Sequence, residues 1–222
     1  MDDGKINREL ILYSFRRCPF AIRARLSIYY STFRCQIREI SLKNKPQEFI
    51  ALSPKATVPV LLKEDHSVIN ESLDIVKWVL GQSDPSGLLA PLYDKNEDVE
   101  NVIYLIDNEF KFHLDRYKYS TRYDTNHKYK HRDSAADILK RIDDKIMANG
   151  FMYGNKISIY ELCILPLIRQ FMIADHDWFE KSFECEKVKK SLQYFINSDA
   201  FKVTMRRYDE WSKDKTKIQY FP

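Results

Sequence analysis

The spacing of hydrophobic positions along the chain changes near residue 80. Up to that point, short apolar runs typical of strands alternate with segments whose apolar residues repeat at helical spacing. This pattern predicts strands at residues 10–13, 33–40, 57–62 and 67–69, and helices at residues 19–30, 47–52 and 70–80. The order of these elements indicates a mixed four-stranded sheet with helices on both faces, an α/β arrangement.

Beyond residue 80, only helical spacing remains. A stretch rich in Gly, Pro, Ser and Asp comes first, as expected of a linker. Helices are predicted at residues 97–117, 134–148, 159–172, 186–196 and 200–211. Ser158 and Glu161 have the spacing of a capping box at the start of the third of these helices, and Pro166 is expected to kink it. We therefore expect an α/β domain at residues 1–82, a linker at 83–95 and an all-α helical bundle at 96–222.

Composition narrows the class of protein. Hydrophobic residues make up 44% of the 222 positions and charged residues 31%, as in ordinary globular proteins. The formal net charge of +4 is too small to require a nucleic-acid partner. No run of ~18 apolar residues predicts a membrane span, and the first residues lack the pattern of a signal peptide. The four cysteines are scattered, without the spacing of a disulfide framework or a metal site, so we expect a cytoplasmic protein with no metal.

One basic segment leaves open the possibility of nucleic-acid binding. Residues 116–132 interleave lysines, arginines and histidines with tyrosines. Such a segment can bind nucleic acid through phosphate contacts and base stacking. The alternative, which we prefer because the overall charge is small, is a solvated helix end and loop.

Cys18 is the strongest candidate for chemistry. It follows the first predicted strand after a short loop, and Pro19 next to it favours the first position of a helix. A helix N-terminus favours negative charge, and Arg16 and Arg17 add positive charge, so the sequence predicts an acidic thiol. Ala21 stands where a second cysteine of a Cys-x-x-Cys pair would be, so a disulfide at Cys18 would have to be resolved by an external thiol.

Three further features suggest a ligand. Pro59 follows Val58 at the start of a strand, where it resembles the proline that faces the thiol in thioredoxin-like folds. That resemblance implies a cis peptide bond, which would turn the Val58 backbone groups toward an extended ligand. Glu71 and Ser72 begin a helix, where they can hold a carboxylate or simply cap the helix. Lys45 lies in a polar loop, where it can bind a second carboxylate or remain solvated. Glutathione has these properties: a carboxylate at each end, a peptide middle and a thiol.

Five motifs in order carry a family resemblance: Arg17-Cys-Pro-Phe-Ala21 with Arg23 and Arg25, Leu42-Lys-Asn-Lys-Pro46, Val58-Pro-Val60, Glu71-Ser72 and Ile157-Ser-Ile-Tyr-Glu161. With them the chain resembles the cytosolic glutathione transferases, and most of all their omega class, which has a glutaredoxin-type cysteine. The resemblance is strong as far as residue 80 and weaker beyond. It implies a thioredoxin-like N-terminal domain, a helical C-terminal domain and a homodimer.

The resemblance also implies roles for individual residues, with glutathione as co-substrate. Cys18 would be the nucleophile that forms a mixed disulfide with glutathione. The glutathione-binding residues would be Phe20 beside the thiol, Val58 and Pro59 at the peptide, Glu71 and Ser72 at the γ-glutamyl end, and Lys45 at the glycine carboxylate. The implied reaction is glutathione-dependent thiol transfer, meaning reduction of mixed disulfides or of small oxidants such as dehydroascorbate.

Two other functions stay open. Conjugating glutathione transferases use a Tyr or Ser near the end of the first strand, where this chain has Tyr13 and Ser14. Some proteins of the same fold bind glutathione or a protein partner without catalysis. The pocket for the second substrate is not readable from the sequence; Tyr117, Tyr123 and Trp211 are candidates for it.

Overall fold

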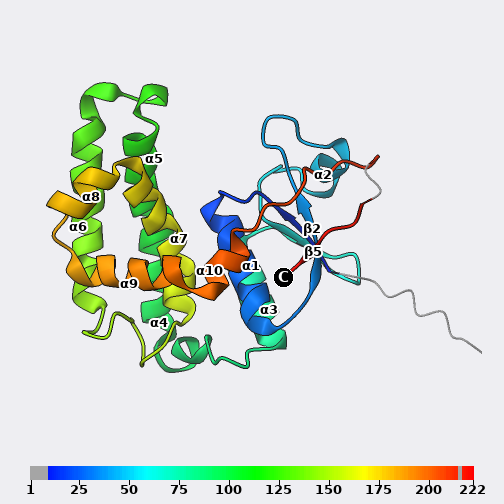
Figure 1. The fold of residues 1–222 in the computed structure, drawn as a ribbon, viewed down its shortest axis with the longest axis horizontal. Coiled ribbons are helices and arrows are strands. Elements are labelled where there is room, and N and C mark those ends of the chain that lie inside the picture. Colours follow the sequence, from blue (N-terminus) through cyan, green and yellow to red (C-terminus); the bar gives the residue numbers. More distant parts are fainter. Residues whose placement is uncertain (1–9, 215–216) are drawn as a thin grey trace, which may run out of the picture. The chain divides into compact units, whose positions relative to one another are not determined.

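A computed structural model describes residues 10–214 and 217–222, and these residues form two compact units. The first, here called the sheet unit, contains the described residues up to Ser86 together with those of Asp199–Pro222. The second, the helical unit, is Gly87–Ser198 (Figure 1). The segment from Asp199 onward therefore belongs with the N-terminal residues, whereas the sequence pattern assigned it to the helical bundle.

The sheet unit is built on a mixed sheet of five strands in the order β4-β3-β1-β2-β5. β1 (Ile11–Ser14) is central, parallel to β2 (Cys35–Glu39) and antiparallel to β3 (Val60–Leu62). β4 (Val68–Ile69) pairs with β3 as the predicted hairpin. β5 (Tyr220–Phe221) pairs antiparallel with β2, so the expected number of four strands was wrong. A two-residue strand far along the chain has no hydrophobic period of its own, which is why the sequence did not reveal it.

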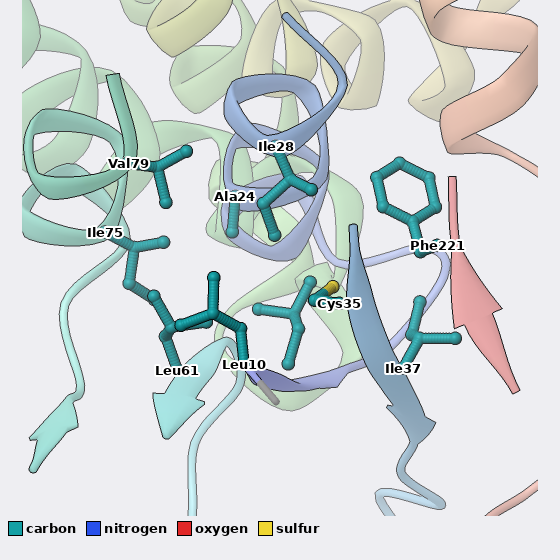
Figure 2. Close-up of a cluster of buried hydrophobic side chains, with 10 residues drawn as sticks. Leu10, Ala24, Ile28, Cys35, Ile37, Leu61, Ile75, Val79 and Phe221 are labelled. Carbon is teal, nitrogen blue, oxygen red and sulfur yellow. The ribbon is translucent and has the colours of Figure 1, made fainter. Parts of the chain in front are cut away.

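Helices cover both faces of this sheet. α1 (Pro19–Ser31) and α3 (Ser72–Gln82) contact one another and share the main apolar cluster. Figure 2 shows the side chains of this cluster, which are Leu10, Leu12, Ala24, Ile28, Cys35, Ile37, Leu61, Ile75, Val79 and Phe221. Phe221 brings β5 into this core and is fully buried. Burying a side chain of this size stabilises a fold by roughly 1.5–3 kcal/mol.

A second apolar cluster includes Phe49 of α2 (Gln47–Leu52) and Tyr13 of β1. The last helix of the unit, α10 (Asp199–Thr204), packs against α1 and is shorter than predicted. Farther along the chain, the backbone N–H of Trp211 donates to the carbonyl of Glu39 at 2.8 Å. This contact anchors the returning chain at the carboxyl end of β2.

The helical unit follows most of the predicted pattern. Its elements are α4 (Ala90–Tyr104), a π-helical turn (Leu105–Phe110), α5 (Lys111–Lys118), α6 (Lys128–Lys145), α7 (Ile159–Ala174), α8 (His176–Ser182) and α9 (Glu186–Asn197). α4, the π turn and α5 follow one another without a break. The sequence predicted a single helix in this part of the chain. α6 begins earlier than expected, and α8 was not predicted. None of the helices within the described ranges has the length and apolarity needed to cross a membrane.

α7 is the centre of this unit, in contact with α4, α5 and α9. All its residues from Ile159 to Ile168 are buried, in agreement with its nearly all-round apolar sequence. Both halves of the predicted capping box are present: Ser158 accepts from the N–H of Tyr160, and Glu161 accepts from the N–H of Ser158 at 2.8 Å. The helix continues past Pro166 to Ala174.

Candidate active site

Cys18 lies where the sequence placed it, between the end of β1 and the start of α1. It occupies the N-cap position of α1, and Pro19 is the first helical residue. Its backbone is fixed on both sides: its N–H donates to the carbonyl of Phe15 at 3.0 Å, and its carbonyl accepts from Ile22 at 2.9 Å. The side chain is half-buried. A rigid turn therefore presents one thiol at a helix N-terminus.

The thiol faces the backbone of Val58. The Cys18 Sγ donates to the Val58 carbonyl oxygen across 3.5 Å. The Val58–Pro59 peptide bond is cis, which confirms that prediction. Both residues are buried, and β3 begins immediately after them at Val60. Thus the structure brings together Cys18, Val58 and Pro59, which are separated by 40 positions in the sequence.

The ionisation of Cys18 differs from the expectation. Burial raises the pKa of the thiol above its ordinary value of 9.0. The backbone amides of Ala21 and Phe20 act in the opposite direction, as do the charges of Arg25 and Arg23, but burial is the larger effect. The prediction of an acidic thiol was therefore wrong, because it considered the helix N-terminus and neglected the loss of solvent around the sulfur.

The sequence analysis included two arginines of α1 in a family motif but gave them no role in the site. Arg23 and Arg25 are both completely buried, although arginine is almost never fully buried unless it is paired. Arg23 donates from Nη1 to the Ser72 hydroxyl at 3.5 Å, and its guanidinium lies 5.0 Å from the centre of the Phe20 ring. These contacts join Phe20 and Ser72 to the helix that carries Cys18. Two arginines on an otherwise apolar helix were the signal in the sequence.

Ser72 and Glu71 stand at the start of α3 in different environments. Ser72 is the first residue of the helix and is buried. Glu71 occupies the N-cap position but makes no side-chain cap hydrogen bond. Its exposed carboxylate instead pairs with Lys55 at 2.6 Å, a surface contact of small energetic value. Glu71 therefore remains at the surface beside a cation.

Lys45 is half-buried in the loop between β2 and α2. Among the residues that the structure describes, no hydrogen bond or ion pair joins Lys45 to the other candidate residues. A cleft of about 280 Å³ lies along the same loop, and Asn44, Pro46 and Trp211 are among its lining residues. The structure thus places Lys45 in a polar loop without assigning it a partner.

Tyr13 and Ser14, the candidates for conjugation, are both buried. The Tyr13 hydroxyl accepts from Arg38 Nη1 at 2.5 Å, and its ring packs against Phe49 and Trp211. Burial raises the pKa of Tyr13, and the neighbouring Arg38 charge opposes the rise only in part. Tyr13 is therefore engaged in packing and in a hydrogen bond, which is unlike a hydroxyl available to activate a bound thiol.

The three residues suggested for a second-substrate pocket belong to different units. Tyr117 is buried within the helical unit, and Tyr123 is exposed after a short 3-10 turn. Trp211 belongs to the sheet unit, where the Arg38 guanidinium lies 4.4 Å from the centre of its ring. No second-substrate pocket is assigned from these residues.

The basic segment at residues 116–132 forms the end of α5, two 3-10 turns and the start of α6. Its cations lie over aromatic rings of the same unit. Arg116 lies 3.4 Å from the centre of the Phe112 ring, and Arg132 lies 4.4 Å from that of Trp178. These contacts use several of the cations and rings to hold the helix ends together.

Within residues 10–214 and 217–222, no three His, Cys, Asp or Glu side chains are arranged to hold a metal ion. Cys35, Cys163 and Cys185 are free and buried, and burial raises the pKa of Cys35 and of Cys185 to about 12. Cys18 is therefore the most accessible thiol among the four.

The fold and site define a class: a thioredoxin-like domain that presents a cysteine at a helix N-terminus opposite a cis-proline, joined to a helical domain. A family model described as "Glutathione S-transferase, N-terminal domain" matches residues 12–87. Residues 12–87 therefore belong to the glutathione S-transferase superfamily, and omega-class members are among the relatives of the chain.

The matches between this chain and its curated relatives cover only part of those relatives. Glutathione S-transferase omega-1 of Rattus norvegicus is 35% identical over 163 residues, which cover 71% of this chain and 65% of that protein. Omega-1 of Sus scrofa is 38% identical over 89 residues, covering 40% of this chain and 36% of the relative. The matched stretches thus span less than two thirds of these relatives.

Solved structures match the fold over nearly the whole chain. Glutathione transferase Omega 3C from Trametes versicolor has a TM-score of 0.75 at 16% identity and covers 92% of both chains. A glutathione transferase from Pseudomonas putida has a TM-score of 0.78 at 16% identity, covering 92% of this chain and 94% of that one. The latter was solved with one glutathione disulfide bound per subunit.

Proposed function

We propose that this protein is a glutathione-dependent thiol transferase whose nucleophile is Cys18. The observation that carries the proposal is the position of the Cys18 sulfur, at the N-terminus of α1 and 3.5 Å from the Val58 carbonyl that precedes the cis-proline. A backbone carbonyl and a thiol so placed suit a ligand that is itself a cysteine-containing peptide. Glutathione is a ligand of this kind, and it is the one expected for a member of this superfamily.

The proposed reaction has two thiol–disulfide exchanges. In the first, the Cys18 thiolate attacks the glutathionyl sulfur of a mixed disulfide, releases the other thiol and forms a disulfide between Cys18 and glutathione. In the second, the thiolate of a second glutathione attacks the glutathionyl sulfur, so that glutathione disulfide leaves and the Cys18 thiolate is restored. One mixed disulfide and one glutathione give one thiol and one glutathione disulfide, with no net change in electrons.

The raised pKa of Cys18 affects the first exchange of this scheme. A buried thiol is mostly protonated before reaction, and its proton must leave before it can attack. The amides of Phe20 and Ala21 and the charges of Arg23 and Arg25 are the groups that favour the thiolate. Deglutathionylation and the reduction of small oxidants such as dehydroascorbate are the activities we propose.

The bound glutathione would use the groups around the thiol. Its cysteine would pair with the Val58 backbone, next to Pro59 and Phe20. Ser72 and Glu71 would hold the γ-glutamyl end, where the first amides of α3 also favour a carboxylate. Lys45 would meet the glycine carboxylate. By the same family reasoning, we infer a cytoplasmic homodimer with no metal cofactor.

Mass spectrometry after exposure to glutathione disulfide tests this proposal. We expect a single glutathione adduct, removed by reductant and located on Cys18. Cys18→Ala should abolish both the adduct and the reduction of a mixed disulfide, whereas Cys185→Ala, a matched change at a buried cysteine in the helical unit, should retain both. Full mixed-disulfide reduction in Cys18→Ala would refute the proposal and would favour conjugation or non-catalytic binding.

A further inference from the structure

The side-chain hydroxyl of Ser72, at the start of α3, has a donor that the described part of the chain leaves unused. Arg23 Nη1 donates to the Ser72 oxygen at 3.5 Å. An arginine has only donors, so the hydroxyl is the acceptor in this contact and keeps its own proton for another partner. Among the described residues no atom accepts that proton, although Ser72 is only 7% exposed. A buried donor of this kind points to a ligand that supplies the acceptor.

α3 adds further donors at the same place. Ser72 is the first residue of this helix, and the first N–H groups of a helix have no acceptor within it. Glu71 at the N-cap makes no side-chain cap hydrogen bond, and its carboxylate pairs with Lys55 instead. The hydroxyl and the helix N-terminus therefore both favour an acceptor that carries negative charge.

Arg23 reaches Ser72 from the neighbouring helix. α1 and α3 pack against each other, and side chains of a helix incline toward its N-terminus, so Arg23 extends toward the end of α1 that carries Cys18. Its guanidinium also lies 5.0 Å from the centre of the Phe20 ring, three positions earlier on the same face of α1. Arg23 is completely buried, and neither of these two neutral groups cancels its charge. A full positive charge is therefore held within hydrogen-bond distance of the Ser72 hydroxyl.

The charge of Arg23 does more than join two helices. Burying a charge is costly, and apolar or neutral polar side chains can join helices at lower cost. An arginine in this position fixes the hydroxyl as a donor, because it occupies the oxygen as an acceptor. It also polarises the hydroxyl, since hydrogen bonds arranged in a chain strengthen one another, and a bond from such a donor to an anion is among the strong ones.

We propose that Arg23 is a positioning residue that holds the Ser72 hydroxyl as a donor to the α-carboxylate of the γ-glutamyl group of glutathione. Arg23 acts through Ser72 and does not touch the ligand, and it makes this end of the site selective for a carboxylate. The inference rests on the proposed function for the identity of the ligand. The contact between Arg23 and Ser72 does not depend on which reaction Cys18 performs.

Isothermal titration of the full-length protein with S-methylglutathione, which has no free thiol, tests this inference. Arg23→Met should raise the Kd about tenfold, and Arg23→Lys, which keeps the charge and a donor, should recover most of the affinity. In a protein that already carries Ser72→Ala, Arg23→Met should have little further effect, because both changes remove the same hydrogen bond to the ligand. Arg34→Met is the control and should leave the Kd unchanged, because Arg34 is an exposed arginine that likewise lies over an aromatic ring.

A second ligand tests the carboxylate itself. In an analogue of S-methylglutathione with γ-aminobutyrate in place of glutamate, only the α-carboxylate is missing. Arg23→Met should bind this analogue with the same Kd as the wild-type protein, because the group that Ser72 is proposed to hold is absent. The effect of Arg23 should therefore depend on the presence of that carboxylate.

A purely structural link between α1 and α3 would behave differently. Loss of Arg23 would then weaken both ligands alike, or its effect would multiply with that of Ser72→Ala, and either result would overturn the proposal. If Arg23→Met does not fold, Arg23→Gln, which keeps a neutral donor, takes its place in the same comparisons. A wild-type protein that does not bind S-methylglutathione would also overturn the proposal, whereas retained mixed-disulfide reduction in Cys18→Ala would refute the proposed nucleophile alone.

Discussion

The thiol of Cys18 donates to the carbonyl oxygen of Val58 across 3.5 Å. A thiol can make this contact only while it carries its proton, because a thiolate has nothing to donate. The contact and the burial of the sulfur therefore both favour the neutral form. The site thus favours the protonated form of Cys18, the proposed nucleophile, beside groups that would stabilise its charged form.

The reaction of Cys18 with iodoacetamide should therefore have its midpoint above pH 9 in the wild-type protein. The raised pKa means that the thiolate fraction near neutral pH is smaller than in an unfolded chain, so alkylation should accelerate when the protein is unfolded in urea. Stopped alkylation followed by peptide mass spectrometry measures this. A midpoint below 8 in the folded protein would show that the amides and arginines outweigh burial.

Tyr13→Phe should leave thiol transfer within about twofold of wild type, because the Tyr13 hydroxyl is engaged by Arg38. Loss of that hydrogen bond should reduce the free energy of unfolding by about 1 kcal/mol. Steady-state assays with a mixed disulfide and with a chlorinated aromatic substrate, together with urea denaturation, separate the two effects. Selective loss of conjugation in Tyr13→Phe would instead identify Tyr13 as the group that activates bound glutathione.

Ser72→Ala and Lys45→Ala should each weaken glutathione binding by roughly 1.5–3 kcal/mol, the range for a hydrogen bond to a charged group. Because the two residues are proposed to hold opposite ends of the tripeptide, their effects should add in the double variant. Isothermal titration with glutathione and with an analogue amidated at the glycine carboxylate tests the orientation. The Lys45 effect should vanish with the analogue while the Ser72 effect persists; an equal Lys45 effect on both ligands would reverse the assignment.

The capping box of α7 should be a main source of stability in the helical unit. Ser158→Ala removes the acceptor for the Tyr160 N–H and should cost about 1 kcal/mol. Glu161→Ala should cost about 3 kcal/mol, because Glu161 accepts from Ser158 and from the N–H of Met152 in a buried place. Urea denaturation measures both. Ser182→Ala, at an exposed position of α8, is the control and should change stability by less than about 0.5 kcal/mol.

Local signals in the sequence were sufficient for much of the fold. The strand–loop–Cys-Pro order located Cys18 and α1, and the Ser158–Glu161 spacing located α7, because neighbouring residues determine these features. The first two features depend on a few adjacent positions, which a sequence displays directly. The cis bond before Pro59 was also predicted correctly, but from the resemblance to thioredoxin-like folds.

The features that the sequence concealed depend on distant residues. The buried Arg25 donates a hydrogen bond to the backbone carbonyl of Arg16. No sequence pattern reveals a contact between an arginine side chain and a loop carbonyl. The raised pKa of Cys18 follows from the atoms packed around it, which the helix N-terminus alone does not reveal. β5 can be recognised as a strand only from its pairing with β2 in the structure. In each case the missing information was a long-range contact.

The pairing of β5 with β2 has a consequence for the order of folding during synthesis. The ribosome completes Gly87–Ser198 before it adds Phe221, so the helical unit can form its core while the sheet unit still lacks a buried side chain and an edge strand. The helical unit is then able to complete its core before the sheet unit does, although N-terminal domains usually fold first. Until residue 221 emerges, the outer edge of β2 remains unpaired, and nascent chains stalled shortly before that point should be prone to aggregation and recognition by chaperones.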